Sequence, residues 1–184
     1  MSELTLETPR IIMRTFRDSD AEAAHGYCGN EENVKYLLKS AKTLAQCRDF
    51  VRFARESAMA EPRTEFHFAL EPKFSESCAI IGTGSLSLDN DQGELNWVIH
   101  RDYWGQGLCT EVGRALLELA FRRLGLRRVT AHCDAENIAS WRVMEKLGMR
   151  REATFIEGRV AYDRAPDVHG DEYAYAILAR EFHG

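Results

Sequence analysis

The 184-residue sequence contains no long hydrophobic run, no paired cysteine motif and no surplus of basic residues. No apolar stretch approaches the roughly 20 residues that a membrane-spanning helix needs. The segment from Met1 to Arg17 lacks the apolar core of a secretory signal. The five cysteines are scattered without a CxxC pair, which argues against a zinc site and a disulfide framework. We therefore expect reduced thiols, no bound metal, no membrane partner and a cytoplasmic location.

The charge balance excludes another class of partner. Lys and Arg number 24 against 29 Asp and Glu, which gives a net charge of −5 and a pI near 5.7. Nucleic-acid binders usually carry a basic surplus, because phosphate neutralisation drives their affinity. We therefore expect no nucleic-acid partner. The length and the ordinary share of hydrophobic residues, 45%, suit one globular domain over residues 1–184. No internal repeat, low-complexity tract or linker interrupts it.

The hydrophobic periodicity predicts a mixed α/β (α+β) chain. Alternation and turn signals predict strands at Arg10–Arg17, Phe66–Leu70, Ala79–Leu88, Glu94–Ile99, Arg128–Cys133, Met149–Glu157 and Tyr173–Leu178. Helical spacing predicts helices at Asp18–Tyr27, Glu31–Leu38, after a cap at Thr43, from Gly107 to Gly125, and at Ile138–Leu147. The strand–helix alternation of the second half indicates α/β crossover units.

The turn from Trp104 to Thr110 joins a predicted strand to a predicted helix. Its glycines, Gly105 and Gly107, permit positive φ and let a ligand approach the backbone closely. The first amides of the following helix lack intrahelical partners, and the helix dipole favours an anion there. No Gly-Lys-Ser/Thr follows, so the turn is not a Walker loop. It lacks the third glycine of GxGxxG as well. The turn therefore predicts a pyrophosphate-bearing ligand of another type.

Two segments of the chain carry a family resemblance. Trp97 to Glu111 resembles the acetyl-CoA signature of the GCN5-related N-acetyltransferases (GNAT), closest to the ribosomal-protein-alanine (RimJ/RimL-like) branch. Asn137 to Met149 resembles the second signature of that branch. The opening Thr8-Pro9-Arg10-Ile11 and the closing Asp171 and Tyr175 also fit its layout. The resemblance thus extends over nearly the whole chain.

The resemblance implies a single GNAT domain, with a mixed central sheet of about seven strands flanked by helices. Acetyl-CoA, as cosubstrate, would lie in a splayed V between the fourth and fifth strands. The residues implied in its binding are Trp97, Val98 and Ile99 through the backbone along pantetheine, Gly105, Gln106, Gly107, Leu108, Cys109 and Thr110 at the pyrophosphate, and the side chain of Asn137. The implied reaction is direct acetyl transfer to a primary amine in a ternary complex.

Two positions depart from the family pattern. Cys109 stands where alanine or glycine is preferred, and Met144 where many distant relatives carry a tyrosine as general acid. A methionine cannot donate a proton. Ser140 is therefore the candidate acid, with a helix-cap role as the alternative reading. Either Glu152 or Glu94 is the candidate base, and each could instead be a solvated strand residue.

Several alternatives stay open. The acceptor is a protein N-terminus or a small-molecule amine, and the polar stretch from Tyr162 to Gly170 is one place where its specificity could lie. The enzyme could also supply no base and select the free amine. A non-catalytic acetyl-CoA sensor or interaction module on the same fold is the second hypothesis. The sequence leaves a homodimer open.

Overall fold

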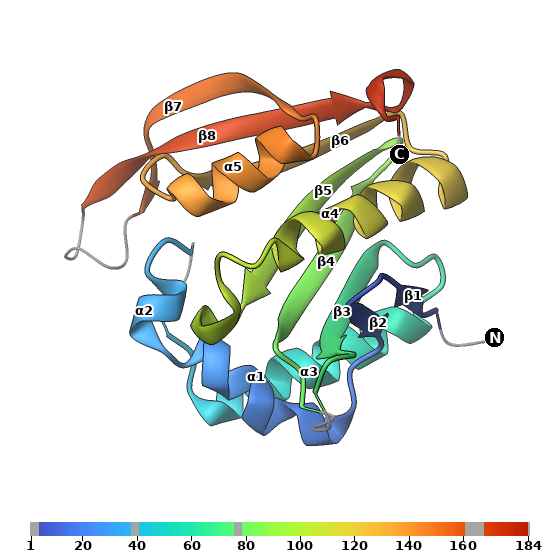
Figure 1. The fold of residues 1–184 in the computed structure, drawn as a ribbon, viewed down its shortest axis with the longest axis vertical. Helices are drawn as coiled ribbons and strands as arrows, with labels where there is room; N and C mark the ends of the chain where they lie inside the picture. The colour runs from blue at the N-terminus through green and yellow to red at the C-terminus, as the bar shows by residue number, and fades with distance from the viewer. Residues whose placement is uncertain (1–3, 38–40, 76–78, 161–167, 184) are drawn as a thin grey trace.

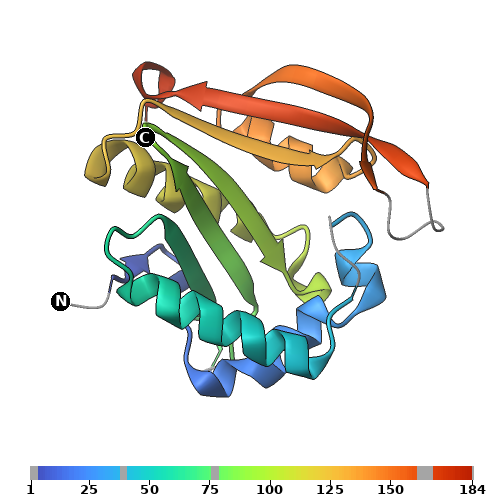
Figure 2. The same cartoon turned by 180° about the vertical axis from the view of Figure 1, so that it is seen from behind.

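The computed structural model describes residues 4–37, 41–75, 79–160 and 168–183 and forms one mixed sheet with helices on both faces, seen from opposite sides in Figure 1 and Figure 2. The strands are β1 (Leu6–Glu7), β2 (Ile11–Arg14), β3 (Glu65–Pro72), β4 (Gly82–Asp89), β5 (Gln92–Ile99), β6 (Arg128–Asp134), β7 (Arg150–Val160) and β8 (His169–Leu178). The α-helices are α1 (Ala21–Cys28), α2 (Glu31–Val34), α3 (Leu44–Met59), α4 (Leu108–Glu118) and α5 (Ile138–Lys146). The short turns of helix are η1 (Asp18–Asp20), η2 (Arg101–Tyr103), η3 (Leu119–Arg123, a π turn) and η4 (Ala179–Glu181).

The sheet has eight strands in the order β1-β2-β3-β4-β5-β6-β8-β7. All neighbouring strands are antiparallel except β5 and β6, which are joined by the α4 crossover and run parallel. The seven predicted strands are confirmed as β2 to β8. The prediction of about seven missed β1, whose two residues are too few to show any alternation. It pairs with β2 through Leu6 and Met13.

Two hydrophobic clusters lie on opposite faces of the sheet. On one face, α4 and α5 pack on strand residues that include Phe68, Leu86, Leu95 and Val129. On the other face, α1 and α3 pack on a smaller cluster, with Val98 of β5 against its border. Side chains alternate between faces along each strand. The neighbours of Leu95 on β5, which include Glu94, therefore point to the α1–α3 face.

Capping residues and glycines with positive φ lie at the helix ends that the sequence predicted. Thr43 accepts a hydrogen bond from the amide of Gln46 at 3.2 Å and caps α3. Gly125 and Gly148 adopt φ of 68° and 80° just after the helical segments that they end. The predicted helix Glu31–Leu38 is shorter, because α2 ends at Val34, and Leu38 lies outside the described residues.

The parallel pair β5–β6 separates halfway along its length. Residue pairs extend from Gln92–Arg128 to Leu95–Ala131, although β5 continues to Ile99 and β6 to Asp134. Beyond the last pair, β5 stays with β4 and β6 stays with β8, so the two halves of the sheet spread apart (Figure 2). We call the region beyond the pair Leu95–Ala131 the β5–β6 divergence. It is the splayed V expected between the fourth and fifth predicted strands.

Candidate functional site

The turn before α4 has the geometry of an anion site. Gly105 and Gly107 adopt φ of 73° and 78°, and Gly107 is the residue that precedes the first turn of the helix. The first amide bonded within the helix is that of Glu111, which donates to the carbonyl of Gly107 at 3.2 Å. The preceding amides, of residues 108–110, are thus directed outward from the helix end. A side chain at Gly107 would come nearest to Arg10, at 3.8 Å. The space beside these amides is therefore open to a ligand.

Arg10 and Glu111 brace this turn, a role that the sequence analysis did not assign. The guanidinium of Arg10 donates to Glu111 at 2.8 Å and to the carbonyl of Gln106 at 2.9 Å. The same carboxylate accepts from the hydroxyl of Thr8 at 2.5 Å. Burial alone would raise the pKa of Glu111, but the hydrogen bonds from Thr8 and Arg10 outweigh it and lower that pKa. The brace therefore carries full charge at neutral pH and fixes the backbone of the predicted cradle.

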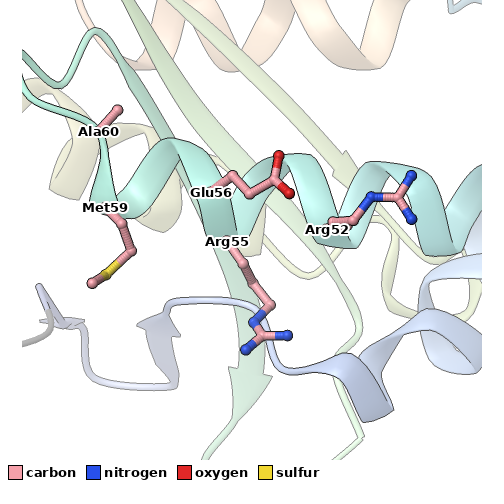
Figure 3. Close-up of a pocket in the computed structure, with 5 residues that line it drawn as sticks. All are labelled: Arg52, Arg55, Glu56, Met59 and Ala60. Carbon is pink, nitrogen blue, oxygen red and sulfur yellow. The ribbon is translucent and has the colours of Figure 1, made fainter.

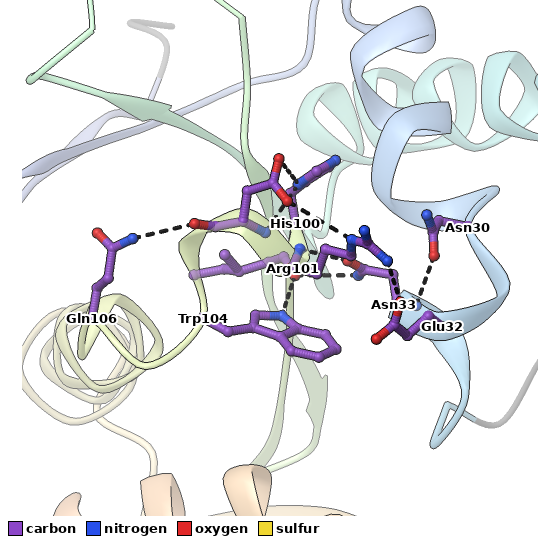
Figure 4. A network of polar contacts seen from close by, with 9 residues as sticks. Asn30, Glu32, Asn33, His100, Arg101, Trp104 and Gln106 are labelled. Carbon is purple, nitrogen blue, oxygen red and sulfur yellow. Dashed lines mark hydrogen bonds and ion pairs between the residues drawn. The ribbon is translucent and has the colours of Figure 1, made fainter.

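A polar network holds the end of β5 in place (Figure 4). The carbonyl of Ile99 accepts from Nε1 of Trp104 at 2.8 Å and from the amide side chain of Asn33 at 3.2 Å. Asn33, which is buried, also accepts from the amide of Arg101 at 2.7 Å. Arg101 in turn pairs with Glu32. Helix α2 thus fixes the chain between β5 and the glycine turn.

The backbone of β5 directs polar groups into the divergence. The amide of His100 donates to the carbonyl of Ile81, the residue before β4, at 2.8 Å, and hydrogen-bonded pairs alternate along an antiparallel ladder. Val98 therefore pairs its backbone with Thr83 of β4, whereas Trp97 and Ile99 turn theirs away from β4. The carbonyl of Ile99 is occupied by the network described above. The amide of Ile99 and both backbone groups of Trp97 remain directed at the divergence, where no described strand pairs with them.

Helix α5 begins on the other side of the divergence. The side chain of Asn137 caps it by accepting from the amide of Ser140 at 3.2 Å. The hydroxyl of Ser140 lies beside the thiol of Cys133, which is on β6 beyond the last β5–β6 pair. Burial, reinforced by the charge of Asp134, raises the pKa of Cys133 to about 12, although the nearby hydroxyl of Ser140 acts in the opposite direction. Ser140 and Asn137 thus lie at the divergence. Met144, 1% exposed, is part of the core.

The two candidate bases occupy different places. Glu152 pairs with Arg128 and Arg150, and the hydrogen bond from Arg128 is the main cause of its lowered pKa. Arg128 is the first residue of β6, at the closed end of the β5–β6 pair, so this position does not favour Glu152 as a base. Glu94 is opposite Thr130, one pair before the divergence. Of the two, Glu94 lies nearer to the predicted reaction site.

Cys109 does not have the properties of a nucleophile. Burial raises the pKa of its thiol to about 12, so almost none is thiolate at neutral pH. We expect Cys109→Ala to retain kcat, because no covalent acetyl-enzyme forms on this residue. Kinetics of the variant, with mass spectrometry of wild-type protein quenched after incubation with acetyl-CoA, check this. An acetylated Cys109 peptide, or a loss of activity in a variant that stays folded, would contradict it.

A surface hollow elsewhere is not part of this site. It lies on the exposed side of α3 and is lined by Arg52, Arg55, Glu56, Met59 and Ala60 (Figure 3). None of these is among the predicted site residues, and helix α3 covers the sheet on the β3 side rather than at the divergence. Within the described part of the chain, no helix has the length and apolar character needed to cross a membrane.

Comparisons with known proteins identify the family of this chain. A family model described as "Acetyltransferase (GNAT) domain" matches residues 10–150. The Bacillus subtilis protein named "Uncharacterized N-acetyltransferase YnaD" is 30% identical over 181 residues, which cover 96% of this chain and 98% of that protein. The structure of an acetyltransferase (GNAT family) from Bacillus anthracis superposes with a TM-score of 0.82 at 28% identity, covering 97% of this chain and 100% of that one.

A more distant structure shares the fold alone. RimL, described as a ribosomal L7/L12 alpha-N-protein acetyltransferase in complex with coenzyme A, superposes with a TM-score of 0.80 at 16% identity. The match covers 95% of this chain and 98% of RimL. The family model covers well over half of the present chain, and the relative YnaD matches nearly all of it. The chain therefore belongs to the GNAT acetyltransferase family and is an N-acetyltransferase.

Proposed function

We propose that this enzyme moves an acetyl group from acetyl-CoA directly to a primary amine, within a ternary complex of both substrates. The observation that carries the proposal is that two unrelated kinds of backbone group face one region. These are the helix-end amides at Gly107 and the unpaired strand groups of Trp97 and Ile99. Together they fit a ligand with an anionic end and an amide-containing arm.

The residues present fit this cosubstrate. The amides of the turn from Gly105 to Thr110 would hold the pyrophosphate, with Leu108 and Cys109 contributing through the backbone. Leu108 is 1% exposed, so its side chain belongs to the core. The pantetheine amides would continue the ladder of β5 along Trp97 and Ile99, and Val98 would hold that strand against β4. Asn137 would close the arm from the side of α5. Donor binding thus needs no cationic side chain in the cradle.

Ser140 is proposed to donate a hydrogen bond to the sulfur that leaves. It stands in the first turn of α5 beside Cys133, at the divergence. A hydroxyl is a weak acid, so this contribution stabilises the departing thiolate until solvent protonates it. Glu94 is the nearer of the two glutamates considered as base, while Glu152 serves to neutralise Arg128 and Arg150.

The acceptor is proposed to be a protein N-terminus or a small-molecule amine, approaching from the α1–α3 face. The turn after α2 borders this side, because Arg159 of β7 donates to the carbonyls of Tyr36 and Leu37. The acceptor stretch expected from Tyr162 to Gly170 lies largely outside the described residues. The described cysteines are free thiols, which supports the proposal of a cytosolic protein.

Acetyl-CoA is expected to stabilise the fold by mass action. A ligand at 100 times its Kd adds about 2.7 kcal/mol, which for a domain of this size raises Tm by roughly 5–10 °C. Thermal melts with acetyl-CoA, and with NAD as the control dinucleotide, measure this, and thiol release against a panel of amines measures turnover. An equal Tm with acetyl-CoA and with NAD would contradict the assignment of acetyl-CoA as the donor. Stabilisation without turnover of any amine would favour a non-catalytic acetyl-CoA sensor.

A further inference from the structure

We propose that His132 accepts the proton of the acceptor amine and that Glu172 positions its ring, an assignment that rests on the proposed function. His132 follows Ala131, the last β6 residue paired with β5. It is therefore the first side chain of β6 at the divergence. Its neighbour Cys133 contacts Ser140 under α5. Because side chains alternate, His132 points to the opposite face, from which the acceptor is proposed to approach.

The groups around His132 favour a basic role. Nδ1 of His132 lies 3.8 Å from a carboxylate oxygen of Glu172 on β8, and the two side chains are 31% and 17% exposed. No hydrogen bond to Nε2 is found among the described residues. A carboxylate beside Nδ1 can orient an imidazole ring, which leaves Nε2 to meet a substrate.

The other charged groups on this face are placed differently. Asp134 of β6 is paired with Arg159 of β7, with both side chains no more than 2% exposed. Glu94 of β5 is opposite Thr130, in the closed part of the pair. The Arg128–Glu152 pair lies further back. His100, 29% exposed at the end of β5, lies 3.6 Å from Asp102, but its Nδ1 accepts from the amide of Asp102 and caps η2. Among these groups, His132 and Glu172 are the pair on β6 and β8 that combines partial exposure with a place at the divergence.

The step balances as follows. An acceptor ammonium gives one proton to Nε2 of His132 and becomes a free amine. The amine nitrogen attacks the thioester carbonyl, the C–N bond forms and the C–S bond breaks. The second amine proton goes to the thiolate, directly or through solvent. His132 returns the first proton to solvent, so one proton is released per turnover of an ammonium substrate.

The test is the pH dependence of kcat/KM with two probe amines, tyramine and a short peptide with a free N-terminal alanine. With an imidazole base, the wild-type profile should level off at a pH below the pKa of the amine. His132→Gln should lower kcat/KM at neutral pH by about 100-fold, and its rate should keep rising until the pKa of the amine. Glu172→Gln should lower kcat and leave KM for acetyl-CoA unchanged, because the carboxylate no longer holds the ring of His132 in place.

Controls separate the outcomes. His183→Gln, an exposed histidine near the end of the chain, should follow wild type. The acetyl-CoA shift in Tm should persist in His132→Gln. If His132→Gln lowers kcat/KM by the same factor at every pH, the role of His132 is structural and the assignment is overturned. A wild-type profile in His132→Gln together with a changed one in Glu94→Gln would transfer the role to Glu94. Absence of turnover by the wild-type enzyme with every amine would instead overturn the proposed function.

Discussion

Replacing Gly107 with valine is expected to weaken acetyl-CoA binding by roughly 10- to 100-fold while the domain stays folded. Gly107 has a φ of 78°, and a β-branched residue is a genuine outlier in that region. Relief of the strain would turn the amides at the start of α4 away from the ligand. The added carbon would meet Arg10 only at an ordinary contact distance, 3.8 Å. The variant should therefore lose affinity for acetyl-CoA more than stability of the core. Calorimetric titration with acetyl-CoA measures this affinity.

Gly125→Val is the matched control for this variant. Gly125 has a φ of 68°, and a carbon added there would contact nothing within 4 Å. It follows η3 and precedes β6, at the closed end of the β5–β6 pair. Both variants should lose similar stability from backbone strain, so only the Gly107 variant should lose affinity. Equal affinity in the two variants would show that the turn is structural and would remove the basis of the cradle.

Local features of this fold could be predicted from the sequence. The strands β2 to β8 and the ends at Thr43, Gly125 and Gly148 depend on period, capping and positive φ, which are properties of neighbouring residues. The divergence itself was expected only through the family resemblance. No local pattern in β5 or β6 indicates where their pairing stops at Leu95.

The braces of the site could not be predicted, because each joins distant segments. Arg10 and Glu111 are separated by 101 positions, and Asn33 and Ile99 by 66. Arginines and glutamates at such separations are common, and nothing local selects a pair. Thr8 and Arg10 lie in a stretch that fits the family layout, which was the one available signal for their part in the cradle.

The position of Glu152 could not be predicted either, because it depends on how β7 pairs with β8. The pairing of β7 with β8 shifts between Arg151 and Ala153, so Glu152 has no direct partner on β8. Such an irregularity locally disrupts the ladder and re-aims the side chain. An offset counted from Gly148 could not foresee this, and it left two salt bridges, to Arg128 and Arg150, unpredicted.

Arg159→Met is expected to lower the free energy of unfolding by about 3–5 kcal/mol, because it removes one partner of a buried ion pair. Arg159 donates to Asp134 at 2.6 Å, and their side chains are 2% and 1% exposed. For a domain of this size the loss corresponds to a fall in Tm of roughly 6–20 °C. Since Arg159 also holds the carbonyls of Tyr36 and Leu37, KM for the acceptor should rise more than KM for acetyl-CoA.

Arg127→Met provides the control for the loss of an arginine as such. Arg127 pairs with Asp91 at 2.7 Å, but these side chains are 59% and 56% exposed, and exposed pairs contribute about 0–1 kcal/mol. Its Tm should stay within a few degrees of wild type. Adding Asp134→Asn to Arg159→Met should recover part of the lost stability, because the buried carboxylate is replaced by a neutral amide. If Arg159→Met instead melts like Arg127→Met, Asp134 is satisfied without Arg159. The hydrogen bonds from Arg159 to the turn after α2 would then contribute nothing measurable to the stability of the fold.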